Sequence, residues 1–139
     1  MIVLDTNVLS EVLRPLPSGR VLQWLARQDP STVFTTSVTQ AEILYGVESL
    51  SPGKRRTRLL SAIERMFAAQ FEGRILAFDE GAARVFAGIV VARETIGRPI
   101  SQADAMIAAI ARSQGGEVVT RNTRDFENCG IVLVNPWEA

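Results

Sequence analysis

The chain has 139 residues, and its hydrophobic content of 47% is typical of a folded globular protein rather than a disordered one. Its 15 Lys and Arg residues balance its 15 Asp and Glu residues, so the chain as a whole has no strong attraction for polyanions. The absence of histidine and the single cysteine, Cys129, exclude Ser-His and Cys-His nucleophile pairs, histidine zinc sites and an internal disulfide framework. Carboxylates and a hard cation are therefore the natural groups for any chemistry on phosphates.

The length and the start of the chain predict one soluble domain, residues 1–139. No apolar run approaches the roughly 20 residues that span a bilayer, and the first residues lack the basic region of a signal peptide. A single cysteine fits a reducing compartment. We therefore expect a cytoplasmic protein with no membrane segment.

Five short apolar runs are predicted to be strands. Most are rich in β-branched residues and do not alternate with polar ones, which is typical of strands covered on both faces of a parallel sheet. They are Ile2–Leu4, Val33–Thr35, Ile75–Phe78, Val118–Thr120 and Val132–Val134.

Segments with helical spacing lie between these strands. Two helices are predicted at Asn7–Leu13 and Ser18–Arg27, and apolar stripes predict three more, from Leu59 to Phe71, from Ala82 to Ile96 and from Ala103 to Ile110. Alternating strands and helices predict an α/β fold with helices over a parallel sheet.

This arrangement brings acidic residues to one edge of the sheet, because helices that follow parallel strands begin at the carboxyl ends of those strands. Asp5 closes the first strand, Glu42 is expected to open the helix after the second, and Asp104 opens the helix that leads into the fourth. The segment Thr120–Asp125 follows the fourth strand. Four segments distant in sequence are thus predicted to meet.

Each acid also has a purely structural interpretation. Asp5 can cap the first helix, and Thr39–Glu42 and Ser101–Asp104 both have the spacing of a capping box. However, Asp104 is the only charged residue in Ala103–Ala111, and Asp5 ends an equally apolar strand. Buried carboxylates near one another require protonation or a cation, and oxygen ligands favour Mg²⁺ or Mn²⁺ over zinc. Taken together, the acids favour a metal site.

In this order and spacing, five short motifs resemble the PIN-domain family, and within it the VapC toxins of bacterial toxin–antitoxin pairs, especially the FitB type. The motifs run along the whole chain and are Ile2-Val-Leu-Asp5-Thr6-Asn7, Thr39-Gln-Ala-Glu42-Ile-Leu-Tyr-Gly46, Ala103-Asp104-Ala-Met-Ile-Ala108, Val119-Thr120-Arg121-Asn122 and Asn135-Pro136-Trp137.

The resemblance implies a three-layer α/β/α domain with a five-stranded parallel sheet of order 3-2-1-4-5. It also implies an endoribonuclease that depends on Mg²⁺ or Mn²⁺, with Asp5, Glu42 and Asp104 as the metal-binding acids and Thr6 and Thr120 as supporting residues. The family often has a fourth acid where this chain has Asn122, which carries no charge. Asp125 is a candidate to replace it as a catalytic acid, and a helix cap or a surface turn is an equal alternative.

We hypothesise in-line attack of a metal-activated water on an RNA phosphodiester. Arg121 and Arg124 are expected beside the site, where they can position flanking phosphates. The basic run Lys54–Arg58 is either a solvated helix start or a second RNA contact. Single-stranded or loop RNA suits an edge cleft better than a duplex.

The resemblance further implies a VapB-like antitoxin as partner, a homodimer or higher assembly with it, and operator DNA contacted only through the antitoxin. Two alternatives stay open at this point. One is an enzyme of another kind, a flap nuclease or a phosphatase with a similar acidic edge. The other is a PIN-like scaffold or regulatory module with little or no catalysis, which Asn122 favours.

Overall fold

A computed structural model describes all 139 residues. In chain order its elements are β1 (Ile2–Leu4), α1 (Thr6–Val12), α2 (Gly19–Ala26), η1 (Pro30–Thr32), β2 (Val33–Thr36), α3 (Ser37–Glu48), α4 (Lys54–Gln70), β3 (Ile75–Leu76), α5 (Glu80–Thr95), α6 (Gln102–Ser113), β4 (Glu117–Val119), η2 (Thr123–Phe126) and β5 (Leu133–Val134). No helix is at once long and apolar enough to cross a membrane.

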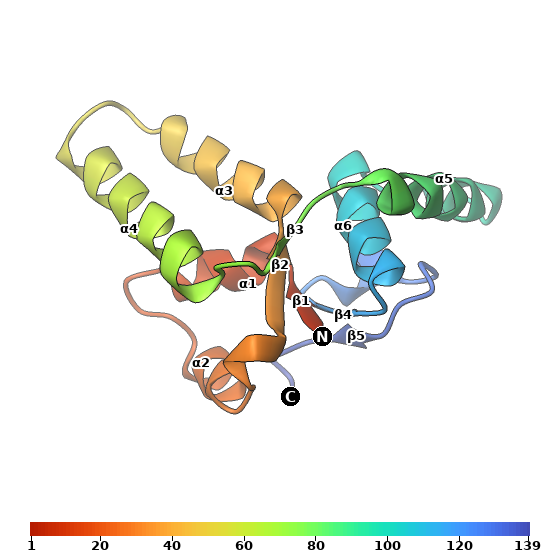
Figure 1. Ribbon diagram of the computed structural model, residues 1–139, viewed down its shortest axis with the longest axis horizontal. Coiled ribbons are helices and arrows are strands. Elements are labelled where there is room, and N and C mark those ends of the chain that lie inside the picture. Colours follow the sequence, from red (N-terminus) through yellow and green to blue (C-terminus); the bar gives the residue numbers. More distant parts are fainter.

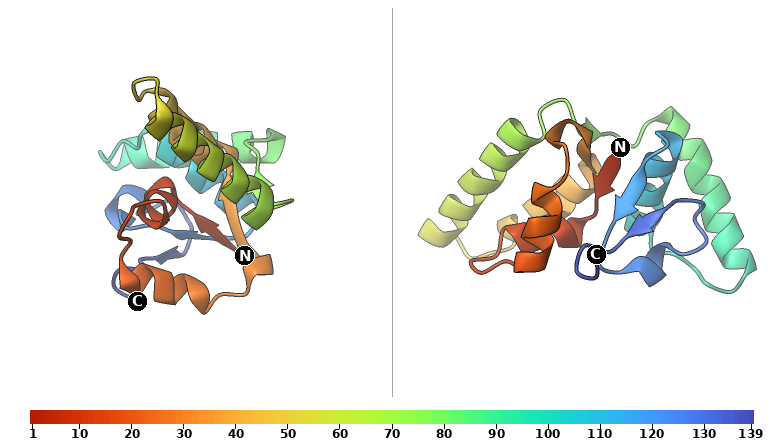
Figure 2. Two further views of the ribbon diagram at one scale, coloured as in Figure 1. Left: turned by 90° about the vertical axis from the view of Figure 1, so that its left-hand side faces the viewer. Right: turned by 90° about the horizontal axis from the view of Figure 1, so that it is seen from below.

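The five strands form one parallel sheet in the order β3-β2-β1-β4-β5, as expected. Helices α1 to α4 cover one face of this sheet and α5 and α6 cover the other, which gives three layers (Figures 1 and 2). The three-layer α/β/α prediction is therefore confirmed.

The central strand β1 shows why the strand sequences lack alternation. Ile2 and Leu4 pack into the apolar core beneath α1 to α4, and Val3 packs into the second core beneath α5 and α6. Both faces of a covered parallel strand are buried, so every position is apolar. Where such a strand ends, a polar side chain comes directly out of the core at the carboxyl edge.

Several predicted boundaries shift by one or two residues. Strand β3 ends at Leu76, two residues before the predicted end, because Phe78 leaves the sheet and packs edge-on against Phe86. Strand β4 ends at Val119, one residue before the predicted end, so Thr120 lies beyond the strand and its hydroxyl donates to Asp5.

The prediction that Glu42 opens a helix was wrong. Helix α3 begins at Ser37, directly after β2, and Thr36 caps it by accepting a hydrogen bond from the N–H of Thr39. Glu42 therefore lies in the second turn of α3, and the alternative capping box from Thr39 to Glu42 was wrong as well. The box from Ser101 to Asp104 does form at its N-terminal half, because Ser101 accepts a hydrogen bond from the N–H of Asp104.

Shortening a buried side chain of β1 tests how much this central strand contributes to the stability of the fold. Leu4 is 2% exposed, so Leu4→Ala is expected to lower the free energy of unfolding by about 2–5 kcal/mol through lost burial and a cavity. Leu16→Ala makes the same change at a side chain that is 89% exposed, and should change the free energy by less than about 0.5 kcal/mol. Urea unfolding measures both, and equal effects would contradict the two-core description.

Candidate active site

An open polar pocket of about 500 Å³ lies at the carboxyl edge of the sheet. It gathers side chains from Asp5 at the end of β1, from α1 and the residues after it, from α3 and α6, and from the two segments that follow β4 and β5. Its lining residues are Asp5, Thr6, Asn7, Ser10, Glu11, Arg14, Glu42, Asp104, Arg121, Asn122 and Trp137. The three acids predicted as metal ligands thus share one pocket.

Asp5 is the deepest acid of the pocket. It is 5% exposed, because it follows β1 directly and its N–H still pairs with the carbonyl oxygen of Val119 in the neighbouring strand. One carboxylate oxygen accepts a hydrogen bond from the N–H of Thr6 at 2.8 Å, which caps α1. The other accepts from the hydroxyl of Thr120 at 2.8 Å and from the amide of Asn7 at 3.2 Å.

The electrostatics of Asp5 are unfavourable for a negative charge. Burial raises its pKa to about 6, and the charges of Asp104 and Glu42 also raise it. The hydrogen bonds from Thr120 and Thr6 act in the opposite direction without cancelling the effect of burial. No ion pair compensates the charge, since the three ion pairs of the protein involve other acids.

Glu42 reaches the pocket from the side of α3. The hydroxyl of Thr6 donates a hydrogen bond to its carboxylate at 2.7 Å and lies 3.1 Å from the hydroxyl of Thr39. Thr6 therefore ties the first turn of α1 to α3. Glu42 itself is exposed, so its carboxylate faces solvent on the open side of the pocket.

Asp104 enters from the opposite helical layer, in the first turn of α6. Its side chain is half-buried, and burial raises its pKa. The negative charges of Asp125 and Glu42 act in the same direction, whereas hydrogen bonding with Ser101 and the positive charge of Arg93 lower it. Each helical layer thus brings one carboxylate to the same edge, Glu42 on α3 and Asp104 on α6.

The other predicted site residues divide into two groups. Asn122 and Arg121 line the pocket, and buried Thr120 lies beneath it and holds Asp5. Arg124 and Asp125 are exposed residues of η2 outside the lining, although the charge of Asp125 is close enough to raise the pKa of Asp104. Asp125 is not a helix cap, because it lies inside η2 and Asn122 is at the cap position.

Asn7 is a site residue that the sequence analysis did not select. Its amide nitrogen donates to Asp5 and to the hydroxyl of Thr120, and its amide oxygen accepts from the N–H of Arg121 at 3.2 Å. It thereby connects the ends of β1 and β4. The sequence signal that could have selected it is its position two residues after Asp5, the acid that ends an apolar strand.

The aromatic residues are placed by packing. Trp24 is buried in the core, Tyr45 is exposed on α3, and Trp137 closes one side of the pocket with the guanidinium of Arg121 5.0 Å from its ring centroid. This cation–π contact orients Arg121 at the pocket rim.

The donor set fits a hard divalent cation in its chemistry. Every candidate ligand is an oxygen, and the deepest one, Asp5, is an acid whose ionised form needs a nearby positive charge. No group of three or more Cys, Asp and Glu side chains is arranged to hold a metal ion together. Mg²⁺ needs only one or two carboxylates because it retains several waters, so the pocket suits an ion held by Asp5 and Asp104 with water completing its shell.

Known proteins resemble this chain over its whole length. The PIN domain family model matches residues 2–131. A VapC ribonuclease of Sinorhizobium fredii is 40% identical over 138 residues, which cover 99% of this chain and 99% of the relative. Toxin FitB of Neisseria gonorrhoeae is 41% identical over 137 residues, again covering 99% of both chains.

Solved structures share the same fold. The crystal structure of FitAcB from Neisseria gonorrhoeae superposes with a TM-score of 0.94 at 40% identity and 100% coverage of both chains. DNA-bound VapBC from Salmonella typhimurium superposes with a TM-score of 0.81 at 28% identity, with 96% of each chain covered.

The raised pKa of Asp5 gives a pH-dependent stability. A carboxyl group that keeps its proton in the folded state, when the unfolded chain has lost it, stabilises the folded state at low pH, and this contribution disappears as the pH rises through about 6. A shift from the usual pKa near 3.9 corresponds to about 3 kcal/mol. In EDTA, Asp5→Asn is therefore expected to gain about 1–3 kcal/mol relative to wild type between about pH 4 and pH 7.5, measured by urea unfolding.

Asp29→Asn is the matched control. Asp29 is an exposed acid at the other end of β2, and hydrogen bonds from Ser31 lower its pKa, so its replacement should give no gain at the higher pH. If the free energy of unfolding of Asp5→Asn relative to wild type were the same at about pH 4 and pH 7.5, burial would not raise the pKa of Asp5.

Proposed function

Because this chain belongs to the PIN-domain family, we propose that it is the toxin of a VapBC-like toxin–antitoxin system and hydrolyses RNA phosphodiesters with the help of Mg²⁺ or Mn²⁺. The observation that carries this proposal is the meeting of Asp5, Glu42 and Asp104, from three distant segments, in one open pocket where no cation pairs with them. Relatives with about 40% identity are named a VapC ribonuclease and a toxin.

Each polar side chain then has a definite task. Asp5 and Asp104 would hold the ion, with Asp5 fixed by Thr120 and Asn7. Glu42, oriented by Thr6, would accept a proton from the attacking water or orient it at the open side of the pocket. When bound, Mg²⁺ or Mn²⁺ supplies the positive charge that makes water more acidic and offsets the charge developing on the phosphate.

The RNA strand would be held by arginines at the rim. Arg121, fixed against Trp137, and Arg14 lie on the pocket lining. A second cavity of about 370 Å³ continues from the first and shares Thr6, Ser10, Arg14 and Glu42 with it. This second cavity reaches Arg55 at the start of α4, within the basic run Lys54–Arg58. A single RNA strand, whose backbone is unpaired, could follow this path from the acids to Arg55.

Of the alternatives to this function, the phosphatase has less support from the structure than the scaffold does. A phosphatase with an Asp nucleophile would need a second acid near Asp5, and Asn7 there donates hydrogen bonds to Asp5 and Thr120. A PIN-like scaffold without catalysis remains the second candidate, because no three acids are arranged to hold an ion and because Asn122 adds no charge to the pocket.

We also propose the partners. An antitoxin would bind this chain, as VapB-type partners do in a solved VapBC complex bound to DNA, and operator DNA would be contacted through the antitoxin. An apolar cavity of about 420 Å³ between β1, α1, α2 and α4 can receive apolar antitoxin side chains. Residues 1–139 would act as one PIN domain and, as the family resemblance implies, would form a homodimer or a higher assembly with the antitoxin.

RNA cleavage tests the proposed function. Antitoxin-free protein is expected to cleave an end-labelled pool of single-stranded RNA with Mn²⁺ or Mg²⁺ and not in EDTA. Asp5→Asn and Asp104→Asn should each lower kcat by more than about 100-fold, since each removes a charge that the ion requires. Asp29→Asn, at the opposite edge of the sheet, should retain full activity.

Two results would favour the scaffold instead. One is a folded wild-type protein that neither cleaves RNA nor binds Mn²⁺ in calorimetry. The other is cleavage that persists at the same rate in Asp5→Asn.

The second cavity predicts the path that the RNA strand takes beyond the acidic pocket. Arg55→Ala should raise KM by about 3–10-fold with kcat nearly unchanged, and should weaken the salt dependence of RNA binding by about one counterion. Arg65→Ala, an exposed arginine further along the same helix that lines neither cavity, is the control. Equal effects of the two substitutions would show that only the overall charge matters.

A further inference from the structure

Arg121 is an unpaired cation on the lining of the acidic pocket. It is exposed and takes part in none of the three ion pairs of the protein, whereas Arg14, the other arginine of the lining, is paired with Glu11 at 3.3 Å. A guanidinium binds carboxylates and phosphates through its N–H groups. Arg121 is therefore the arginine of this lining that is free to bind an anion.

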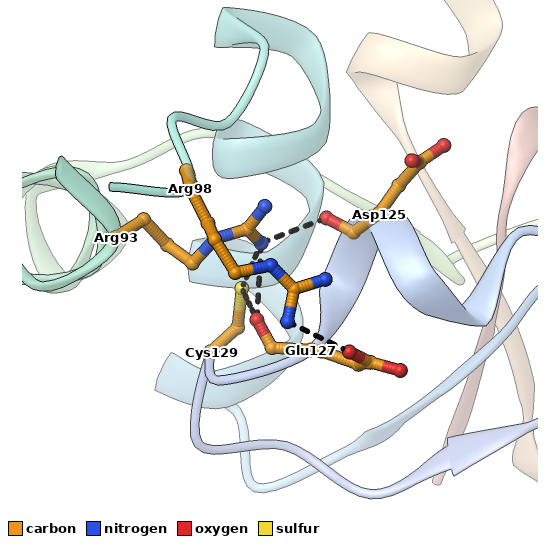
Figure 3. Close-up of polar contacts among 5 residues, drawn as sticks. All are labelled: Arg93, Arg98, Asp125, Glu127 and Cys129. Atoms are coloured by element: carbon orange, nitrogen blue, oxygen red, sulfur yellow. Dashed lines mark hydrogen bonds and ion pairs between the residues drawn. The ribbon is translucent and has the colours of Figure 1, made fainter. Parts of the chain in front are cut away.

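Arg93 shows the opposite case, an arginine whose N–H groups are occupied by the fold (Figure 3). It is 4% exposed, and its Nε donates to the carbonyl oxygen of Arg98 at 2.6 Å. Its Nη1 donates to the carbonyl oxygens of Asp125 at 2.9 Å and Glu127 at 3.0 Å. The clamp of Arg93 thus fixes η2 against α5, and the residue serves the structure rather than a ligand.

The backbone of Arg121 is held on both sides. Its N–H donates to the amide oxygen of Asn7 at 3.2 Å, and its carbonyl oxygen accepts from the amide nitrogen of Asn135 at 3.5 Å. Asn135 follows β5, and the N–H of Thr120 pairs with the carbonyl oxygen of Val134 beyond the end of β4. The two neighbouring strand ends therefore place Arg121 beside the turn that begins at Asn135.

The turn Asn135–Trp137 brings an aromatic ring to the guanidinium. The amide oxygen of Asn135 accepts from the N–H of Trp137 at 2.9 Å, which turns the chain around buried Pro136. Trp137 packs against the apolar core beneath α1 to α4, and the guanidinium of Arg121 lies 5.0 Å from its ring centroid. A ring anchored on the core restricts where the charge of Arg121 can lie.

Helix α2 holds the same turn from another direction. Nη1 of Arg20, in the first turn of α2, donates to the carbonyl oxygen of Trp137 at 3.0 Å. Arg20 is exposed and is not part of the pocket lining. Its hydrogen bond therefore reaches the pocket only through Trp137.

We propose that the turn Asn135–Trp137 is a positioning element for Arg121: Trp137, held in turn by Arg20, keeps the guanidinium at the pocket rim, where its unpaired N–H groups bind an RNA phosphate. This inference rests on the proposed function and adds Trp137, Asn135 and Arg20 to its site. A long side chain loses rotamer freedom when it binds a ligand, and a ring that already orders it lowers this loss.

A double-mutant cycle in RNA binding tests the link between Trp137 and Arg121. Fluorescence anisotropy would measure Kd for a labelled single-stranded RNA pool in EDTA, which prevents metal-dependent cleavage. The proteins are wild type, Arg121→Ala, Trp137→Ala and the double variant, all checked for folding by circular dichroism. Arg121→Ala is expected to weaken binding about tenfold and Trp137→Ala about threefold. The double variant should match Arg121→Ala within about 1.5-fold, because Trp137 acts through Arg121.

The salt dependence of Kd separates positioning from a general loss of structure. Arg121→Ala should reduce the slope of log K against log salt by about 0.7, the value for one phosphate of a single strand, and Trp137→Ala should reduce it by part of that amount. Partial unfolding would lower the binding-competent fraction without changing the slope. Trp137→Phe keeps an aromatic face and should restore Kd to within about twofold of wild type.

Arg20→Ala and Arg27→Ala form the matched pair. Each removes one exposed positive charge from α2 or its C-cap, but only Arg20 holds Trp137. Arg20→Ala is expected to weaken RNA binding about two- to threefold, and Arg27→Ala should stay within about 1.5-fold of wild type. Equal losses would overturn the role of Arg20, and this comparison decides even if Trp137→Ala does not fold.

The positioning role and the proposed function fail in different ways. Additive losses in the double variant would mean that Trp137 contacts RNA itself, as in base stacking, and would overturn the proposal, as would an unchanged salt slope in Arg121→Ala. If wild type cleaves RNA with Mn²⁺ while Trp137→Ala binds it with wild-type affinity, only the positioning role fails. Coupled binding without cleavage leaves the phosphate site and overturns the proposed catalysis, and a wild-type protein that binds no RNA overturns both.

Discussion

The burial of a carboxylate at the end of the central strand is the constraint on which the rest of this structure depends. Asp5 follows three apolar residues of β1 that are buried on both faces of the sheet, so its carboxylate comes out of the core where little water reaches it. Three hydrogen bonds partly stabilise the buried negative charge, but burial still raises the pKa of Asp5 to about 6. Such a group favours a proton or a cation at this point.

The surrounding polar groups are arranged to keep this acid in place. The hydroxyl of Thr120, at the end of the neighbouring strand, donates to Asp5, and Asn7 joins the two strand ends. Thr6 performs the corresponding task for Glu42. These are short, uncharged side chains that orient the acids without neutralising them, so the negative potential of the pocket is preserved for an ion.

The two helical layers contribute opposite sides of the pocket. Glu42 arrives on α3 from the layer of α1 to α4, and Asp104 arrives on α6 from the layer of α5 and α6. Neither layer alone brings the acids together, since they meet only because both pack on the same sheet. Arg93 belongs to this second layer and extends its influence to η2 through backbone carbonyls.

The sequence by itself determined the strands, most helices and the strand-end acids, because these depend on residues close together in the chain. Apolar runs without alternation predict covered parallel strands, and Asp5 and Asp104 are conspicuous as lone charges beside apolar segments. The start of α3 could not be read in this way. Thr35, Thr36, Ser37 and Thr39 all have hydroxyl groups that can cap a helix. Thr36 is the cap because β2 ends there with an extended backbone, which leaves its hydroxyl to accept from the N–H of Thr39.

Only the tertiary structure decided which distant groups touch. The hydrogen bond from Thr120 to Asp5 joins residues 115 positions apart, and the contact of Arg93 with Asp125 joins residues 32 apart. Both depend on strand order, register and helix packing. The clamp of Arg93 is directed at main-chain carbonyl oxygens, which every residue carries, so no side-chain pattern in the sequence could mark its partners.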